Sequence, residues 1–391
     1  MRFSALDGWR GICAMGVVLF HAGGPIAWSG SDLALLREAN LFVDYFFVLS
    51  GFVMGHTYDD RIEDMRSAGV FMIRRFGRLW PLHVAVLALY IALEVVALMI
   101  EGHFGNFAAH PAFTYNKTPS SLLTNLLLIH SLGIHDQFTW NTPSWSISVE
   151  FWTYVVFAGM LVLAKRHRSM IAVGLAGFGV AGIAISGRYM EAAFDYGILR
   201  CLYGFFLGYL VFRLCATRPS GPVVKLHAAT AVEALVVVLL VLYVSYLDKP
   251  PYSLLGSPLF ALSVFVFSLE QGRLSQWLSG WPFQQIGTWS YSIYMIHMLM
   301  LVVFMAAIRF IEKGFHLHLR GTTLLKYDGE LQFTFGSTLA GDAVVAAFAL
   351  AVIAAASLTY RFIEDPCRHY ANGVADRLSA PRSVAWNAPR R

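Results

Sequence analysis

Three ionisable side chains near the start of the chain have the spacing of one helical face. Arg10 and His21 are eleven residues apart, which is close to three helical turns, or roughly 16 Å along the axis. Asp7 lies one turn before Arg10 on the same face. A neutral histidine in a dry site can act as a general base toward a hydroxyl group. A hydrogen-bonded core histidine is the alternative, but three polar groups on one face of an apolar helix favour catalysis by His21, Arg10 and Asp7.

A cluster of arginines, Arg74, Arg75 and Arg78, precedes a long apolar stretch. Arg75 and Arg78 are three residues apart and share a helical face. We expect the cluster at the N-terminus of a helix, where free N–H groups would add to its grip on a phosphate. Pro81 would then lie near the first turn, where proline is tolerated. The alternative is a basic anchor at the cytoplasmic face of the membrane.

Two carboxylates interrupt other apolar stretches. Glu150 lies in PSWSISVEFW, and Asp44 lies in LFVDYFFVLSGF. A carboxylate inside a membrane is costly and needs a partner. His21 or an arginine could be that partner, and the sequence leaves open which carboxylate supports His21. We count Glu150 among the catalytic candidates and Asp44 among the substrate-binding ones.

Further polar and aromatic residues are candidates for binding a substrate. Some surround Glu150, and others lie in the late stretch TWSYSIYMIH, where Tyr294 and His297 share a helical face. The aromatic residues would also fit an interfacial belt, which is the alternative. The substrate-binding candidates are Asp44, Trp145, Ser146, Tyr291, Tyr294 and His297.

Membrane helices must position these residues. Of the 391 residues, 57% are hydrophobic and 14% are charged, whereas roughly a quarter are charged in soluble proteins. Ten apolar stretches are near the roughly 20 residues that span a bilayer. The sequence thus predicts an all-α integral membrane bundle of about ten transmembrane helices, with a short re-entrant or half helix at 121–134. The predicted spans are 9–28, 40–57, 79–100, 144–164, 170–187, 194–214, 227–247, 252–270, 285–310 and 338–362.

The loop charges predict the orientation. With ten spans, the arginines of 57–78, the KRHR of 165–168 and the basic loop 213–225 all fall on one side, and the positive-inside rule makes that side cytoplasmic. Both termini are then cytoplasmic. We expect residues 1–370 to form a single transmembrane domain and residues 371–391 a flexible cytoplasmic tail. The segments predicted to be external are 29–39, 101–143, 188–193, 248–251 and 311–337.

Six ordered sequence blocks cover residues 5 to about 370 and resemble the acyltransferase-3 family of membrane acyltransferases. The blocks are LDGWRGICAMGVVLFHA, FFVLSGF, RRFGRLWP, PSWSISVEFW, GTWSYSIYMIH and LTYRFIEDP. The resemblance implies a ten-helix fold and O-acyl transfer, usually of acetyl, from cytoplasmic acyl-CoA to an extracytoplasmic sugar. It also implies that His21 is the catalytic base and that Arg10 is its essential companion.

The expected layout combines these features. Arg74, Arg75 and Arg78 hold the phosphates of acyl-CoA, whose thin pantetheine arm reaches His21 between the helices. Acyl-CoA is a co-substrate, so we expect no tightly bound cofactor, and the four cysteines show no disulfide or metal pattern. The expected partners are acyl-CoA, a carbohydrate such as an exopolysaccharide, lipopolysaccharide or glucan, and the bilayer of a bacterial inner membrane, without nucleic acid. The oligomeric state stays open.

Two other classes of function compete with acyl transfer. A transporter or flippase for a glycan or anionic metabolite would also place arginine, histidine and acidic residues inside the bundle. Such proteins often show inverted repeats, and no repeat is visible in this sequence. A membrane scaffold or sensor would be indifferent to the loss of His21.

Overall fold

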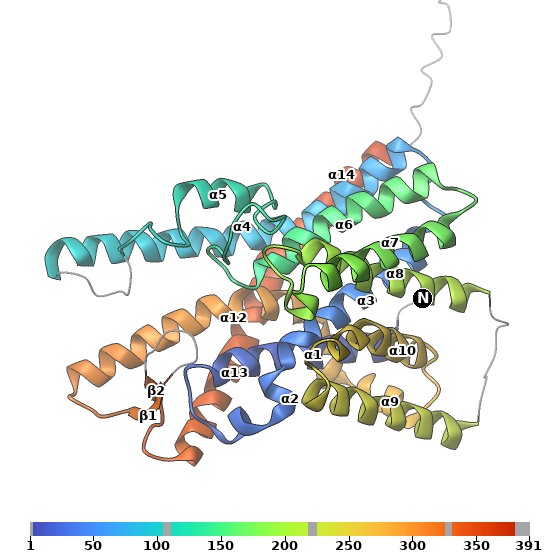
Figure 1. The fold of residues 1–391 in the computed structure, drawn as a ribbon. Helices are drawn as coiled ribbons and strands as arrows, with labels where there is room; N and C mark the ends of the chain where they lie inside the picture. The colour runs from blue at the N-terminus through green and yellow to red at the C-terminus, as the bar shows by residue number, and fades with distance from the viewer. Residues whose placement is uncertain (1–2, 105–110, 218–224, 325–330, 380–391) are drawn as a thin grey trace, which may run out of the picture.

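The computed structural model describes residues 3–104, 111–217, 225–324 and 331–379. Their regular structure is almost entirely helical, which confirms the predicted all-α class (Figure 1). The long helices are α1 (Ser4–Gly23), α3 (Phe42–Tyr58), α4 (Met65–Phe104), α6 (Ser144–Leu163), α7 (Arg168–Ile185), α8 (Gly197–Ala216), α9 (Leu226–Tyr246), α10 (Gly256–Ser268), α12 (Trp281–Gly314) and α13 (Thr338–Thr359).

Short elements connect and cap these helices. Strands β1 (Arg320–Leu324) and β2 (Leu331–Phe333) pair antiparallel. The other α-helices are α2 (Ala34–Arg37), α5 (Pro119–Leu126), α11 (Arg273–Leu278) and α14 (Asp365–Ser379). The 3₁₀ turns are η1 (Ser29–Asp32), η2 (Ala39–Leu41), η3 (Tyr189–Glu191) and η4 (Tyr252–Leu255), and η5 (Tyr360–Glu364) is a π-helical turn.

Within the described residues, eight helical segments are long and apolar enough to cross a membrane. The other two predicted spans correspond to α1, which carries Asp7, Arg10 and His21, and to α10, which has only 13 residues. The structure therefore supports a multi-pass membrane protein, while the count of ten remains a prediction. In the apolar stretch at 121–134, helix is limited to residues 121–126, the later part of the eight-residue helix α5, in agreement with the predicted half helix.

Helices α1 and α12 are in backbone contact. A Cβ atom added to Gly287 of α12 would lie 2.1 Å from the carbonyl oxygen of Asp7 on α1, so only a glycine permits this approach. Arg10 lies beside Gly287 and Ser290, while His21 lies beside His297 further along both helices. The two helices therefore run parallel, and the close packing places the polar face of α1 against α12.

Helix α4 corrects two expectations. It begins at Met65 and has 40 residues, so Arg74, Arg75 and Arg78 lie in its interior and not at its N-terminus. Their backbone N–H groups are bonded within the helix and add nothing to an anion site. Pro81 is likewise inside the helix and not in its first turn. The part of the helix that precedes the apolar stretch packs against α14.

Helix α14 runs alongside the first half of α4 (Figure 1). Arg66 donates hydrogen bonds to the carbonyl oxygen of Leu378, and Arg74 pairs with Asp376 at 2.6 Å. The predicted boundary at residue 370 falls inside α14, so ordered helix continues to Ser379. Residues 380–391, which complete the predicted tail, lie outside the described residues.

Polar contacts join the loops at each end of the bundle. Asp59, in the segment 57–78, accepts a hydrogen bond from Arg213 at 3.0 Å, and its backbone carbonyl accepts one from Arg168 at 2.6 Å. These contacts connect three segments predicted to be cytoplasmic. Lys249 pairs with Glu38 at 3.5 Å and connects two segments predicted to be external. The loops that the charge pattern assigns to the same side therefore meet in the structure.

Candidate active site

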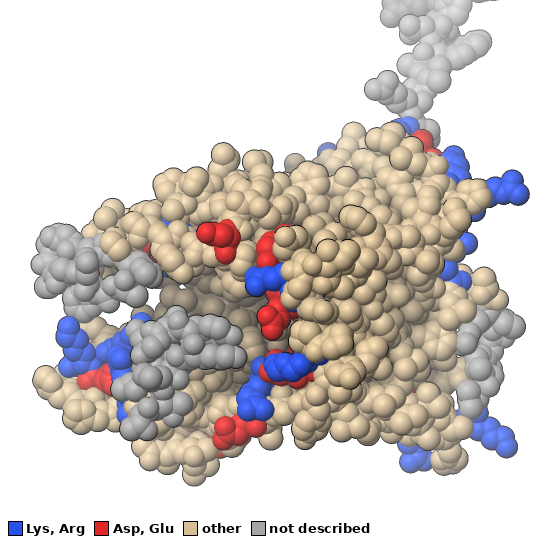
Figure 2. Space-filling model, viewed as in Figure 1, with Lys and Arg blue, Asp and Glu red and all other residues tan. Residues whose placement is uncertain are grey.

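A cavity of about 170 Å³ lies between α1, α3, α4, α6 and α12. Its lining combines three guanidinium groups, one carboxylate, several hydroxyl groups and apolar side chains. Figure 2 shows that one face of the molecule is hollowed and that acidic and basic side chains gather along the hollow. The polar lining residues are Arg10, Ser50, Arg75, Arg78, Ser146, Glu150, Tyr154, Ser290, Tyr291 and Tyr294.

Arg10 is held on both sides of its guanidinium group. Its Nη2 donates to the Gly287 carbonyl oxygen at 2.7 Å, and its Nε donates to the Ser290 hydroxyl at 2.8 Å. Asp7 forms an ion pair with Arg10 at 3.1 Å. Asp7 was expected among the catalytic residues, and the structure makes it a partner of Arg10 one turn away. The remaining surface of the guanidinium group faces the cavity.

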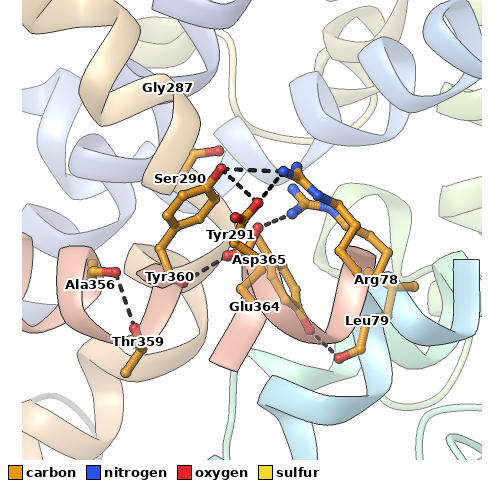
Figure 3. Close-up of polar contacts among 12 residues, drawn as sticks. Arg78, Leu79, Gly287, Ser290, Tyr291, Ala356, Thr359, Tyr360, Glu364 and Asp365 are labelled. Carbon is orange, nitrogen blue, oxygen red and sulfur yellow. Dashed lines mark hydrogen bonds and ion pairs between the residues drawn. The ribbon is translucent and has the colours of Figure 1, made fainter. Parts of the chain in front are cut away.

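The three arginines of α4 have different partners. Arg74 is bound to Asp376 of α14 and does not line the cavity. Arg78 lines the cavity, forms an ion pair with Glu364 and lies 5.3 Å from the ring centre of Tyr291 (Figure 3). Arg75 also lines the cavity, and its Nε has no hydrogen-bond partner among the described residues. The expected phosphate cluster is therefore divided, with Arg75 the least committed member.

Glu364 is a site residue that the sequence analysis did not single out. It is buried, pairs with Arg78 and accepts a hydrogen bond at 2.7 Å from the hydroxyl of Ser292 on α12. It closes the π-helical turn η5, where α13 passes into α14 (Figure 3). Such turns insert one residue and redirect side chains, often at functional sites. The available signal was an acidic residue in the block LTYRFIEDP.

Glu150 lies on the cavity wall but forms no contact with His21. It accepts a hydrogen bond from the Tyr154 hydroxyl at 2.7 Å, and the Tyr154 oxygen lies 2.8 Å from the hydroxyl of Ser50. Glu150 therefore faces the same cavity as Arg75 and Arg78. Among the described residues, no hydrogen bond or ion pair joins Glu150 to His21, so the support of His21 by Glu150 stays a prediction.

Asp44, which was expected to bind substrate, forms a buried ion pair with Arg200 in this structure. Both of its carboxylate oxygens accept hydrogen bonds from Arg200 of α8, at 2.8 and 2.7 Å, and both side chains are buried. The guanidinium carbon of Arg200 lies 5.3 Å from the ring centre of Trp145. Neither Asp44 nor Trp145 lines the cavity. The sequence analysis missed Arg200, whose position in an apolar stretch was the available signal.

The other expected substrate-binding residues come together on α6 and α12. Ser146 donates a hydrogen bond to the Tyr294 hydroxyl at 2.9 Å, and both residues line the cavity. Tyr291 also lines the cavity, but its hydroxyl donates to the Leu79 carbonyl oxygen at 2.5 Å (Figure 3). These hydroxyl groups lie on the wall between α6, α12 and α4. They can bind a ligand that extends along the cavity.

His21 lies beyond the cavity, about three helical turns after Arg10 on α1. The imidazole rings of His21 and His297 have centroids 5.1 Å apart and planes inclined by 39°. Neither histidine lines the cavity, but Tyr294 connects the two regions, because its side chain lines the cavity and its carbonyl oxygen lies 2.7 Å from Nδ1 of His297. Within the described residues, no group of three or more metal-ligating side chains is present.

Comparisons with known proteins identify relatives along the whole chain. A family model described as an acyltransferase domain matches residues 3–360. The acyltransferase MdmB of Streptomyces mycarofaciens is 24% identical over 100% of this chain and 98% of its own length. A protein of Komagataeibacter xylinus named as a membrane-bound transacylase, BcsY, is 26% identical over 75% of this chain and 71% of its own. The peptidoglycan O-acetyltransferase OatA of Listeria monocytogenes is 24% identical over 75% of this chain and 48% of its own. No solved structure matches the chain.

Proposed function

This chain belongs to the acyltransferase-3 family of acyl-transferring membrane enzymes, and from that premise we propose that it moves an acetyl group from cytoplasmic acyl-CoA to a hydroxyl group of an extracytoplasmic carbohydrate. The acceptor class that we propose is an exopolysaccharide, a lipopolysaccharide or a glucan at a bacterial inner membrane. Acyl transfer in a membrane is supported by relatives whose names describe a transacylase and an O-acetyltransferase.

The observation that carries the proposal is the cavity lined by Arg10, Arg75 and Arg78. Coenzyme A bears several phosphate charges, and arginine grips phosphate through paired N–H donors. Arg75 is the residue best placed for this role, because its neighbours in the cluster already bind Asp376 and Glu364. Ser146 and Tyr294 line the part of the cavity nearest His297. A pantetheine arm that extends past these residues would bring the thioester toward His21.

His21 is the base in this proposal. One of its ring nitrogens takes the proton of the acceptor hydroxyl while the oxygen attacks the thioester carbonyl carbon. The C–S bond breaks, and the released thiolate of coenzyme A takes the proton back. Arg10, fixed by Gly287 and Ser290, presents a positive charge to the donor between the arginines of α4 and His21.

The first prediction tests this base. Inside-out membrane vesicles prepared from cells that make the acceptor glycan expose the cytoplasmic face, so acetyl-CoA labelled in its acetyl group can be added and the label followed into glycan. His21→Ala should lower the transfer rate by about 10²- to 10⁴-fold, the range that general-base catalysis contributes. His227→Ala, which alters an exposed histidine at the start of α9, is the matched control and should retain the wild-type rate.

Near-normal transfer by His21→Ala would overturn the assignment of the base. Movement of glycan across the vesicle membrane without consumption of acetyl-CoA would instead support a flippase. Loss of transfer in both variants would show that the assay reports expression or insertion, so the amount of folded protein in each membrane is measured in parallel.

A further inference from the structure

His297 has one ring nitrogen whose protonation follows from its neighbour. Its Nδ1 lies 2.7 Å from the carbonyl oxygen of Tyr294, and a carbonyl oxygen can only accept a hydrogen bond. Nδ1 therefore carries the hydrogen and donates it. In the neutral ring, this tautomer leaves Nε2 with a free lone pair. The backbone of α12 thus turns Nε2 of His297 into a hydrogen-bond acceptor.

That acceptor is buried and unsatisfied. His297 has 0% of its surface exposed, and its Nε2 has no hydrogen-bond partner among the described residues. A buried acceptor without a donor destabilises a protein, so almost every such group in a folded chain has a partner or a functional reason. Nε2 therefore requires a hydrogen-bond donor from a nearby side chain or from a ligand.

His21 is the donor in reach. Its ring centre is 5.1 Å from that of His297, and an imidazole-to-imidazole hydrogen bond of about 3 Å places two ring centres about 5 Å apart. Among the described residues, the half-buried side chain of His21 forms no hydrogen bond, and its ring packs between Phe20 and His297. A small rotation of the ring, whose plane is inclined by 39° to that of His297, would direct one N–H at Nε2.

Neither Asp44 nor Glu150, the two carboxylates that the sequence suggested for this role, contacts His21 in the described part of the chain. Asp44 is bound by Arg200 through both oxygens, and Glu150 accepts from Tyr154. A histidine that acts as a base needs a partner for its second nitrogen, since that hydrogen bond fixes which nitrogen is free to accept a proton. His297 is the side chain that faces His21 in the position where a carboxylate often orients a catalytic histidine.

We propose that His297 is the positioning residue for His21. Nε2 of His297 accepts the N–H of His21, which holds the opposite nitrogen of His21 unprotonated and directed at the acceptor hydroxyl. The chain of contacts ends at the carbonyl oxygen of Tyr294, so a rigid helix sets the orientation of the base. This inference rests on the proposed function and specifies how its base is prepared.

Two substitutions that differ in the position of one amide group test the proposal. In His297→Gln the side-chain amide reaches the position of Nε2 and can accept from His21. In His297→Asn the amide stays at the position of Nδ1, where it keeps the contact with Tyr294 but offers His21 no acceptor. In the vesicle assay with labelled acetyl-CoA, we expect His297→Asn to lower kcat about 100-fold, the cost of a misplaced catalytic group. The kcat of His297→Gln should stay within about fivefold of the wild-type value, because its side-chain amide oxygen can still accept the hydrogen bond from His21.

A readout of donor binding separates positioning from packing. The KM for acetyl-CoA and the melting temperature in detergent should be unchanged in His297→Asn, because the donor site and the contact with Tyr294 remain. Wild-type kcat in His297→Asn would overturn the proposal. Equal loss of kcat in both variants, with a lowered melting temperature, would also overturn it and assign His297 to packing. Since His21→Ala is measured alongside, an active His21→Ala identifies failure of the proposed function, whereas an inactive His21→Ala with an active His297→Asn identifies failure of this inference alone.

Discussion

At the scale of single residues, the arginines of α4 differ in what their removal would do. Arg78 neutralises the buried Glu364, and deleting one partner of a buried ion pair typically costs about 3–5 kcal/mol of stability. A loss of activity on changing Arg78 would therefore mix folding with binding. Arg75 has no ion pair in the described part of the chain and lies 5.7 Å from the ring centre of Tyr58, so its removal leaves no buried charge of this kind behind.

We expect Arg75→Ala to weaken acetyl-CoA binding about 10- to 100-fold, which corresponds to the loss of one charge-assisted hydrogen bond. The remaining affinity should also depend less on salt, since one phosphate contact is missing. Isothermal titration of the detergent-solubilised protein at two NaCl concentrations measures both effects. Arg74→Ala is the control and should change the affinity less than about threefold, because Arg74 forms an ion pair with Asp376 outside the cavity. Equal effects of the two substitutions would contradict the division of the cluster.

At the scale of elements, the close packing of α1 on α12 places Arg10 and His21. The approach depends on glycine, because a Cβ at position 287 would overlap the backbone of Asp7 at 2.1 Å. Backbone cannot yield as a flexible side chain does, so a larger residue must separate the helices. Separation would move Arg10 away from the Gly287 carbonyl and His21 away from His297 together. The catalytic geometry and the helix contact are therefore one property of this pair.

Gly287→Ala should destabilise the protein by about 1–3 kcal/mol, as overpacking of a tight contact does, and should reduce acetyl transfer more than its loss of folded protein explains. Gly314→Ala lies on the same helix, where a Cβ would meet nothing within 4 Å, and should leave both properties unchanged. Thermal unfolding in detergent and the vesicle assay measure the two quantities. A Gly287→Ala variant with normal stability and normal transfer would show that α1 and α12 need not be this close.

At the scale of the whole molecule, polar contacts between loops occur at both ends of the helix bundle. Asp59 joins the loops before α4, after α6 and at the end of α8, all of which carry the basic residues that predict a cytoplasmic side. Lys249 and Glu38 join two loops at the other end. On α4, Arg75 lies toward the end of the bundle where Asp59 joins the loops. His21, in the last turn of α1, lies toward the end where Lys249 pairs with Glu38. The proposed direction of acyl transfer, outward, follows from this division.

Ten alternating spans predict opposite sides for two exposed positions. Arg166→Cys and Lys249→Cys, each in a chain whose native cysteines are replaced by alanine, report the sides of the α6–α7 and α9–α10 connections, where both residues are exposed. In intact cells a membrane-impermeant maleimide should label position 249 and should label position 166 only after lysis, because arginine- and lysine-rich loops are retained inside. Labelling of both positions from the same side would contradict ten spans.

The sequence by itself determined the membrane character, the family and most of the polar residues that line the cavity. Long apolar stretches can exist only as lipid-exposed or mutually packed helices, because the bilayer offers the backbone no other hydrogen-bond partner. The helical period alone placed Asp7, Arg10 and His21 on one face of α1. These conclusions depend on local spacing, which the chain carries without reference to its partners.

Only the tertiary structure decided which charges meet. Asp44 and Glu150 look alike in sequence, yet one is bound by Arg200 and the other faces the cavity. Glu364 lies far along the chain from Arg78, so no local period predicts their pairing. The α4 arginines lie in the half of that helix that packs against α14. His21 faces His297 because two helices that are distant in the sequence are in contact. Partners separated by hundreds of residues are selected by helix packing, and helix packing is a property of the whole fold.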